Sequence, residues 1–151
     1  MMKQLTWNQK FDCGINEINQ QHEEIFFLIN QLIAKEQVRE QVQEQEKELL
    51  IKSEINQLLQ LILEKLVRHF NYEENLFISF KFPQSKIHQE IHNLFMDMVR
   101  DFIHDYIALG PNEPPIIPIN QFIDYLSKWF IEHIIGPDKE YAQFISKASQ
   151  V

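Results

Sequence analysis

The sequence predicts an all-α protein: an antiparallel up-down-up-down four-helix bundle with an N-terminal arm and a short C-terminal tail helix. Two observations indicate this class. Apolar residues recur at i, i+3 and i+4 in four long stretches, as on the buried faces of amphipathic helices. The 151 residues include only three glycines, and four of the six prolines gather between Pro111 and Pro118, so turns are too few for an all-β fold. The length suits one domain over residues 1–151 with a buried core.

An N-terminal arm, residues 1–17, precedes a first predicted helix over about residues 18–35, in which Asn19 is a candidate N-cap. The next residues, 37–48, are rich in Gln and Glu, which is typical of a solvated helix end or turn. A second helix is predicted over about residues 47–80.

Pro83 separates the second helix from the third, and the Pro-rich break after Gly110 separates the third from the fourth. Gly136 and Pro137 are expected to end the fourth helix, as a C-cap glycine followed by a proline. These remaining helices are predicted over about residues 84–108 and 119–135, with the tail at 139–151.

The composition narrows the class of partner. The net charge is −8 and no Lys/Arg cluster occurs, which disfavours nucleic acid and anionic membrane as partners. The single cysteine, Cys13, excludes an internal disulfide and Cys-based metal sites. The N-terminus lacks the apolar core of a signal peptide, so we expect a cytoplasmic protein. Once the four apolar stripes are packed together, little apolar surface should remain, so we expect a monomer.

Five histidines and two carboxylates interrupt the apolar stripes at helical spacing. One such histidine is more often a hydrogen-bonded core residue than a ligand. Burying so many polar side chains on different helices would, however, cost several kcal/mol of folding free energy if they had no partners. In an up-down-up-down bundle all of them fall near one end, which favours a shared metal centre. The residues are His22, His69, Glu73, His88, His92, His133 and Asp138.

The donor set narrows the choice of metal. It is too large for one tetrahedral zinc and too rich in nitrogen for magnesium or calcium. Two iron ions bridged by the two carboxylates would use the whole set. The Glu-x-x-His pairs of ferritin-like di-iron bundles are absent from the sequence.

The segments around these candidate ligands resemble the hemerythrin family in its single-domain bacterial form. The resemblance covers nearly the whole chain and includes Trp7 and Gly14, upstream of the first candidate ligand. The matching segments are residues 19–22, 69–74, 88–92 and 129–133, the last leading to Asp138.

The resemblance implies a role for each candidate ligand. Three histidines, His88, His92 and His133, would complete one iron, while His22 and His69 would hold the other and leave it one open site. Glu73 and Asp138 would bridge both iron ions, together with an oxo or hydroxo bridge. A dry wall around the open site would come from four aromatic residues: Phe26, Phe70, Trp129 and Phe130.

The implied function is reversible binding of dioxygen for storage, delivery or sensing, by an oxygen-binding protein and not an enzyme. Two alternatives stay open: a di-iron enzyme that acts on nitric oxide or peroxide, and an iron-storing or structural bundle. The chain departs from the family at Asn19, where Asp is common, and at Phe130, where an aliphatic residue is usual.

Some residues and segments are expected to lie outside the centre. By helical spacing His104 and Glu74 should face solvent. The extra length of the chain relative to compact family members should form longer helical hairpins at the end away from the metals.

Overall fold

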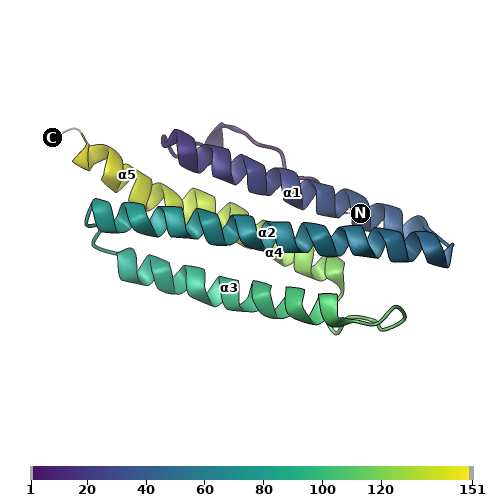
Figure 1. The fold of residues 1–151 in the computed structure, drawn as a ribbon. Coiled ribbons are helices and arrows are strands. Elements are labelled where there is room, and N and C mark those ends of the chain that lie inside the picture. Colours follow the sequence, from purple (N-terminus) through teal and green to yellow (C-terminus); the bar gives the residue numbers. More distant parts are fainter. Residues whose placement is uncertain (1, 150–151) are drawn as a thin grey trace.

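The fold is an antiparallel bundle of four helices, seen in a computed structural model that describes residues 2–149. Neighbouring helices run in opposite directions, and a further helix follows at the C-terminus (Figure 1). No β-strand occurs among residues 2–149, so the predicted fold class is confirmed. The helices are α1 (Asn16–Gln41), α2 (Gln45–Ser79), α3 (Ser85–Ala108), α4 (Ile119–His133) and α5 (Lys139–Ala148), with a 3-10 turn η1 (Gln9–Phe11) and a π turn η2 (Ile134–Asp138).

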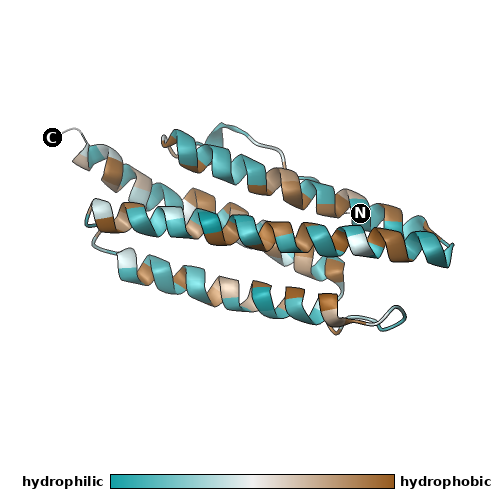
Figure 2. Ribbon diagram, viewed as in Figure 1, coloured by the Kyte–Doolittle hydropathy of each residue, from teal (hydrophilic) through white to brown (hydrophobic). Residues whose placement is uncertain are grey.

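The core forms where the apolar stripes of the four helices meet. Hydrophobic and hydrophilic positions alternate along each ribbon at helical spacing (Figure 2). Each helix contributes side chains that are completely buried, and burial of one such aliphatic side chain contributes about 1.5–3 kcal/mol. Representative members are Ile29, Leu59, Val99 and Leu126, one from each helix.

A smaller apolar cluster attaches α5 to the connection between α2 and α3. Phe77 and Phe82 pack against Tyr141, with ring centroids 4.8 and 6.4 Å apart. The start of α1, this connection and α5 therefore share one end of the bundle, opposite the α3–α4 loop (Figure 1). The predicted tail helix exists and lies against the bundle.

The N-terminal arm is tied to α1 by polar contacts. The Leu5 backbone N–H donates to Asn30 Oδ1 at 2.7 Å, and Asn30 Nδ2 donates back to the Leu5 carbonyl at 2.8 Å. Asn19 is not the N-cap, because α1 begins three residues earlier with Ile15 in that position. The Asn19 side chain instead accepts from the Cys13 N–H at 3.1 Å and so holds the end of the arm.

The two hairpins that were expected to be long and helical differ from each other. Only residues 42–44 connect α1 to α2, so the first hairpin is long and helical as predicted. In the second hairpin α3 ends at Ala108 and α4 begins at Ile119, as predicted, and the predicted Pro-rich break over residues 109–118 is an irregular loop. Four prolines in that loop lack backbone N–H groups and fix φ, which prevents a helix from forming there.

The prediction that Gly136 and Pro137 end the helical segment is wrong. The chain continues from α4 through the π turn η2 into α5, with Pro137 inside the turn. Proline cannot donate the i→i+4 hydrogen bond of an α-helix, and a wider i→i+5 turn accommodates the missing donor. The helical path therefore passes through this segment without stopping.

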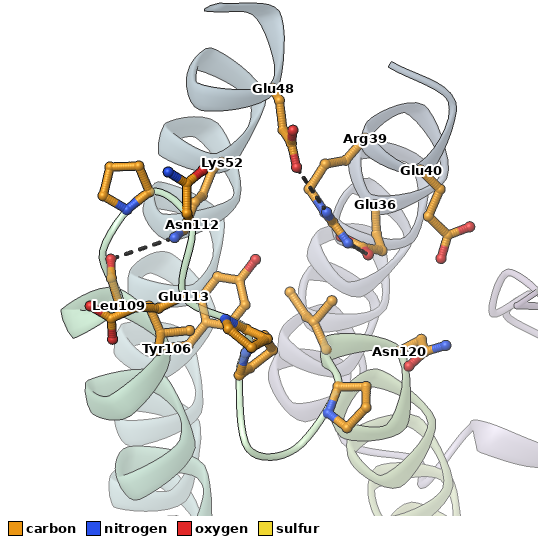
Figure 3. Close-up of a pocket in the computed structure, with 15 residues that line it drawn as sticks. Glu36, Arg39, Glu40, Glu48, Lys52, Tyr106, Leu109, Asn112, Glu113 and Asn120 are labelled. Carbon is orange, nitrogen blue, oxygen red and sulfur yellow. Dashed lines mark hydrogen bonds and ion pairs between the residues drawn. The ribbon is translucent and has the colours of Figure 1, made fainter. Parts of the chain in front are cut away.

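Charged residues join the helices at the end that carries the α3–α4 loop (Figure 3). Glu36 is buried and accepts two hydrogen bonds from Arg39, one of them from Nε at 2.8 Å. Arg39 also contacts Glu48 on α2 at 3.4 Å, and Lys52 donates to the Gly110 carbonyl at 3.1 Å. These contacts tie α1, α2 and the loop together at the end away from the histidines.

The surface is more apolar than expected. Leu94 on α3 is 74% exposed and Ile116 in the α3–α4 loop is 96% exposed. Some apolar side chains therefore stay on the surface after the four apolar stripes have packed together. Within residues 2–149, none of the helices combines the length and apolar composition needed to cross a membrane.

Candidate metal centre

The fold brings together all seven residues that the sequence singles out as ligands. They come from all four helices and from η2, at the end of the bundle that carries α5. Spacings of four residues place His69 above Glu73 on α2, and His88 above His92 on α3. Every one of the seven is at most 4% exposed. The imidazole and carboxylate groups therefore face one another in a chamber shielded from bulk solvent.

One group of donors contains three imidazoles. The Nε2 atom of His133 lies 3.0 Å from that of His88 and 3.1 Å from that of His92. Asp138 Oδ1 is 2.9 Å from His133 Nε2, and Glu73 Oε2 is 3.1 Å from His92 Nε2. These five residues offer ligand atoms that all lie within 4.8 Å of one another.

The second group contains two imidazoles. His22 Nε2 and His69 Nε2 are 3.1 Å apart, and the same distance separates His22 Nε2 from Asp138 Oδ2. Glu73 Oε1 lies 3.1 Å from His69 Nε2 and 3.9 Å from His22 Nε2. These four residues also offer ligand atoms within 4.8 Å of one another.

The two carboxylates belong to both groups. Glu73 turns Oε1 toward His69 and Oε2 toward His92, while Asp138 turns Oδ1 toward His133 and Oδ2 toward His22. Each carboxylate therefore divides its two oxygens between the groups, which is the arrangement that lets one carboxylate serve two cations.

Hydrogen bonds within the chain do not satisfy this donor set. Glu73 Oε2 and Asp138 Oδ1 are buried, and although imidazole nitrogens lie close to both, neither oxygen accepts a well-aligned hydrogen bond from any of residues 2–149. An unpartnered buried polar atom costs on the order of 1–3 kcal/mol. A cation in each group would satisfy these oxygens and the converging Nε2 atoms at once.

The spacing of the donors also fits metal ions. Two ligands at right angles on bonds of about 2.1 Å are roughly 3.0 Å apart, whereas tetrahedral ligands are roughly 3.4 Å apart. Neighbouring ligand atoms in both groups, imidazole Nε2 atoms and carboxylate oxygens, are 2.9–3.2 Å apart at their shortest separations. The ligand atoms of each group therefore lie close enough together for one metal ion to contact them all.

The local electrostatics favour the protonation states that bind metals. Burial opposes ionisation of Glu73 and Asp138, but contacts with histidines outweigh it and lower both pKa values, that of Glu73 to about 2. Burial lowers the pKa of His22, so its ring is neutral at pH 7. For His133 the charge of Asp138 outweighs burial and raises the pKa. The carboxylates are thus ionised, as metal ligands must be, and a metal bound to His133 would compete with the proton that Asp138 favours on that ring.

Three residues that the sequence reasoning missed hold the donors in place. Gln21 Oε1 accepts from His69 Nδ1 at 2.7 Å, and the Tyr141 hydroxyl donates to Glu73 Oε1 at 2.8 Å. Glu74, expected to face solvent, is only partly exposed and accepts from His92 Nδ1 at 3.2 Å. An acceptor on Nδ1 leaves the lone pair of Nε2 directed into the chamber.

The four predicted wall residues lie along both groups, and Phe70 contacts each group, with its ring 5.5 Å from that of His69. Phe130 lies beside the two-histidine group, 5.5 Å from the His22 ring and 5.9 Å from Phe26. Phe70 stacks on His92 at 4.0 Å and Trp129 stacks on His133 at 4.4 Å. The apolar wall therefore surrounds both groups.

His104 lies outside the centre, as expected. Its side chain is 85% exposed and contacts only the neighbouring Asp105, at 3.4 Å, among the described residues. Cys13 sits half-buried at the end of the arm, where burial raises the pKa of its thiol to about 11.

The chain resembles known proteins over most of its length. Residues 13–145 match the family model described as Hemerythrin HHE cation binding domain. A hemerythrin-like protein of Naegleria gruberi is 29% identical over 138 residues, which is 89% of this chain and 88% of the relative. Bacteriohemerythrins of Stenotrophomonas maltophilia and Pseudomonas aeruginosa are 24% and 25% identical over 142 and 144 residues, covering 93% and 95% of this chain and 81% and 83% of those relatives. The chain therefore belongs to the hemerythrin HHE cation-binding family.

Proposed function

We propose that the centre holds two iron ions and binds dioxygen reversibly. Glu73 and Asp138 would bridge the ions, together with an oxo or hydroxo group. The observation that carries this proposal is the pair of adjoining donor groups that share both carboxylates. The groups are unequal, because one contains three imidazoles and the other two. The ion held by His22 and His69 would therefore have one protein ligand fewer, and that position would be available to dioxygen.

The mixed imidazole and carboxylate donors support iron. Imidazole is a donor that suits iron, the carboxylates would balance its charge, and bound iron would supply the reversible electron transfer that dioxygen binding needs. Two relatives of this chain carry the name bacteriohemerythrin. One group offers five ligand atoms, one more than the four that zinc takes in a structural site, which also favours iron over zinc.

The chain's own residues would orient the ligands before the metals arrive. Gln21 and Glu74 accept the Nδ1 protons of His69 and His92, so both rings present Nε2 to the chamber. Tyr141 donates to Glu73 Oε1 and fixes the rotation of a carboxylate that both groups use. These contacts reduce the conformational freedom that the ligands would otherwise lose on metal binding.

Aromatic side chains would keep water away from the available position. Phe130 is completely buried beside His22 and His69, and Phe26, Trp7 and Phe11 pack behind it. An apolar wall favours a small apolar ligand such as dioxygen over water and ions. Storage, delivery and sensing of dioxygen all fit such a site.

Iron content and the visible spectrum together test the proposal. Protein loaded with ferrous iron should contain two iron ions per chain, gain a visible absorption band on exposure to oxygen and lose it on deoxygenation. His22→Ala should abolish the band, while His104→Ala, which removes an exposed histidine, should leave it unchanged. A stoichiometrically loaded protein without an oxygen-dependent band would contradict the proposal.

Two further measurements distinguish the alternatives. Catalytic turnover of nitric oxide or peroxide by the reduced protein, abolished in Glu73→Ala, would identify an enzyme. Variable iron content that stays the same in His22→Ala and His133→Ala would identify an iron-storing or structural bundle. Reversible oxygen binding without turnover is the outcome that we expect.

A further inference from the structure

An apolar groove of about 410 Å³ lies between α3 and α4, at the end of the bundle away from the histidines. Met98 and Phe102 of α3 form one wall, and Phe122 and Tyr125 of α4 form the other. The α3–α4 loop closes one end with Ile116 and Ile117. The groove shares no residue with the candidate metal centre.

The apolar side chains at this groove are more exposed than the fold requires. Ile116 is 96% exposed, and the side chains of Ile117, Met98 and Tyr125 are exposed as well. Pro115 and Pro118 flank the two isoleucines and fix the local backbone, so this wall is preorganised. Leu94, one turn before Met98, extends the apolar strip along α3. A contiguous exposed strip of this kind is typical of an interaction surface.

The charged residues that line the groove are acidic, and Arg100 is the basic residue nearest to them in the sequence of α3. Asp97, Asp101 and Asp105 follow one another at intervals of four residues, so they form a row along the exposed side of α3. Asp97 and Asp101 form no ion pair with any residue of the described chain, and Asp105 contacts only His104. Asp101 and Asp105 line the groove itself, and none of the described residues that line it is basic.

We propose that this groove binds an amphipathic helix of a partner protein, with apolar anchors between α3 and α4 and basic side chains along the aspartate row. Residues four apart on a helix are about 6 Å apart along its axis. Lys or Arg residues one turn apart on a docked helix would therefore match the spacing of Asp97, Asp101 and Asp105. The apolar side chains of the groove would receive apolar residues of the partner helix at positions i, i+3 and i+4, as in other helix-in-groove complexes.

Charge disfavours the other occupants of such a groove. The chain carries a net charge of −8, and two copies that met at this face would bring their aspartate rows close together. An anionic membrane surface would be repelled by the same carboxylates. A basic helix is the occupant whose charge complements the row.

A labelled synthetic peptide tests the proposal on the full iron-loaded chain. The probe is a helix of about five turns with leucines on one face and lysines one turn apart beside them. Fluorescence anisotropy should show saturable one-to-one binding that Ile116→Ser and Asp101→Lys each weaken at least tenfold. Replacement of the peptide lysines by glutamates should abolish binding.

Matched controls separate the groove from the rest of the surface. Ile78→Ser and Glu140→Lys change an exposed apolar and an exposed acidic residue at the other end of the bundle, and should alter the affinity less than twofold. Equal affinity in all four variants would overturn the proposal. So would a dimer of the wild-type chain in sedimentation that Ile116→Ser dissociates, because that result would assign the groove to a second copy.

Discussion

His133 and Asp138 are five residues apart in the chain, yet His133 Nε2 lies 2.9 Å from Asp138 Oδ1. In an α-helix residues five apart point about 140° away from each other. The π turn η2 brings them to the same side, because its hydrogen bonds join residues i and i+5. The Asp138 carboxylate, which contacts histidines of α1, α3 and α4, thus depends on a local departure from α-helical geometry.

Pro137→Ala should therefore weaken metal binding without unfolding the bundle. Alanine restores a backbone N–H, which allows an ordinary α-helical turn to replace η2 and swings Asp138 out of the chamber. We expect iron affinity to fall at least tenfold in competition with a chelator, while the far-ultraviolet circular dichroism stays helical. Ile135→Ala, a change at an exposed position of the same turn, is the control. Unchanged affinity in Pro137→Ala would show that the turn does not depend on proline.

The helices and the candidate ligands could be predicted because they follow from periodicity. His22, His69 and His88 each continue an apolar stripe, and alternation of chain direction places them at one end of the bundle. The connection between Gly136 and Asp138 could not be predicted in the same way, because Gly-Pro is a typical helix end. The structure shows the helical path continuing through η2 into α5, which packs against α2 and the connection that follows it.

The contacts that support the ligands were missed for a different reason. Gln21 lies next to His22 in sequence but contacts His69 of another helix, and Glu74 lies next to Glu73 but contacts His92 of α3. Periodicity assigns a residue to the inner or outer face of its own helix. A side chain at the border of the two faces can reach a neighbouring helix, and this depends on how the helices are rotated against each other.

Gln21→Ala should lower metal affinity about 10–100-fold, as loss of a residue that orients a ligand commonly does. Without the Gln21 oxygen, the Nδ1 atom of His69 has no acceptor and the ring can rotate or change tautomer. Chelator competition measures the affinity, and Gln20→Ala, at the exposed neighbouring position, is the matched control. Equal affinities in the two variants would show that the His69 ring is held by packing alone.

Leu126→Ala should destabilise the metal-free protein by about 2–5 kcal/mol, whereas Leu94→Ala should change its stability by less than about 0.5 kcal/mol. Leu126 is completely buried in the core between the helices, and Leu94 is 74% exposed on α3. The same chemical change therefore creates a cavity at one position and none at the other. Urea unfolding followed by circular dichroism gives both free energies, and similar losses would contradict the assignment of Leu126 to the core.

The stability of the protein should fall between about pH 10 and pH 12 through Tyr106. Burial, followed by the charge of Glu36, raises the pKa of Tyr106 from 10.0 to about 12 in the folded protein. A group with a raised folded pKa contributes fully below its unfolded pKa, and this contribution is lost as pH rises toward the folded value. Tyr106→Phe should therefore show a smaller loss of unfolding free energy over this range, by up to about 2 kcal/mol. Parallel pH profiles for the two proteins would contradict this prediction.

Removal of metal should lower the unfolding temperature, because the donor groups are then left buried without a cation. Glu73 Oε2 and Asp138 Oδ1 accept no well-aligned hydrogen bond within the described chain, and each would keep part of its desolvation cost in the metal-free protein. Ligand binding to the folded state adds about 2.7 kcal/mol of stability at a hundredfold excess over Kd. Calorimetric scans of iron-loaded and chelator-treated protein measure the difference, which should shrink in Asp138→Asn because one shared carboxylate charge is lost. An equal difference in this variant and the wild type would mean that Asp138 contributes nothing to metal binding, and that the iron is held by the remaining donors.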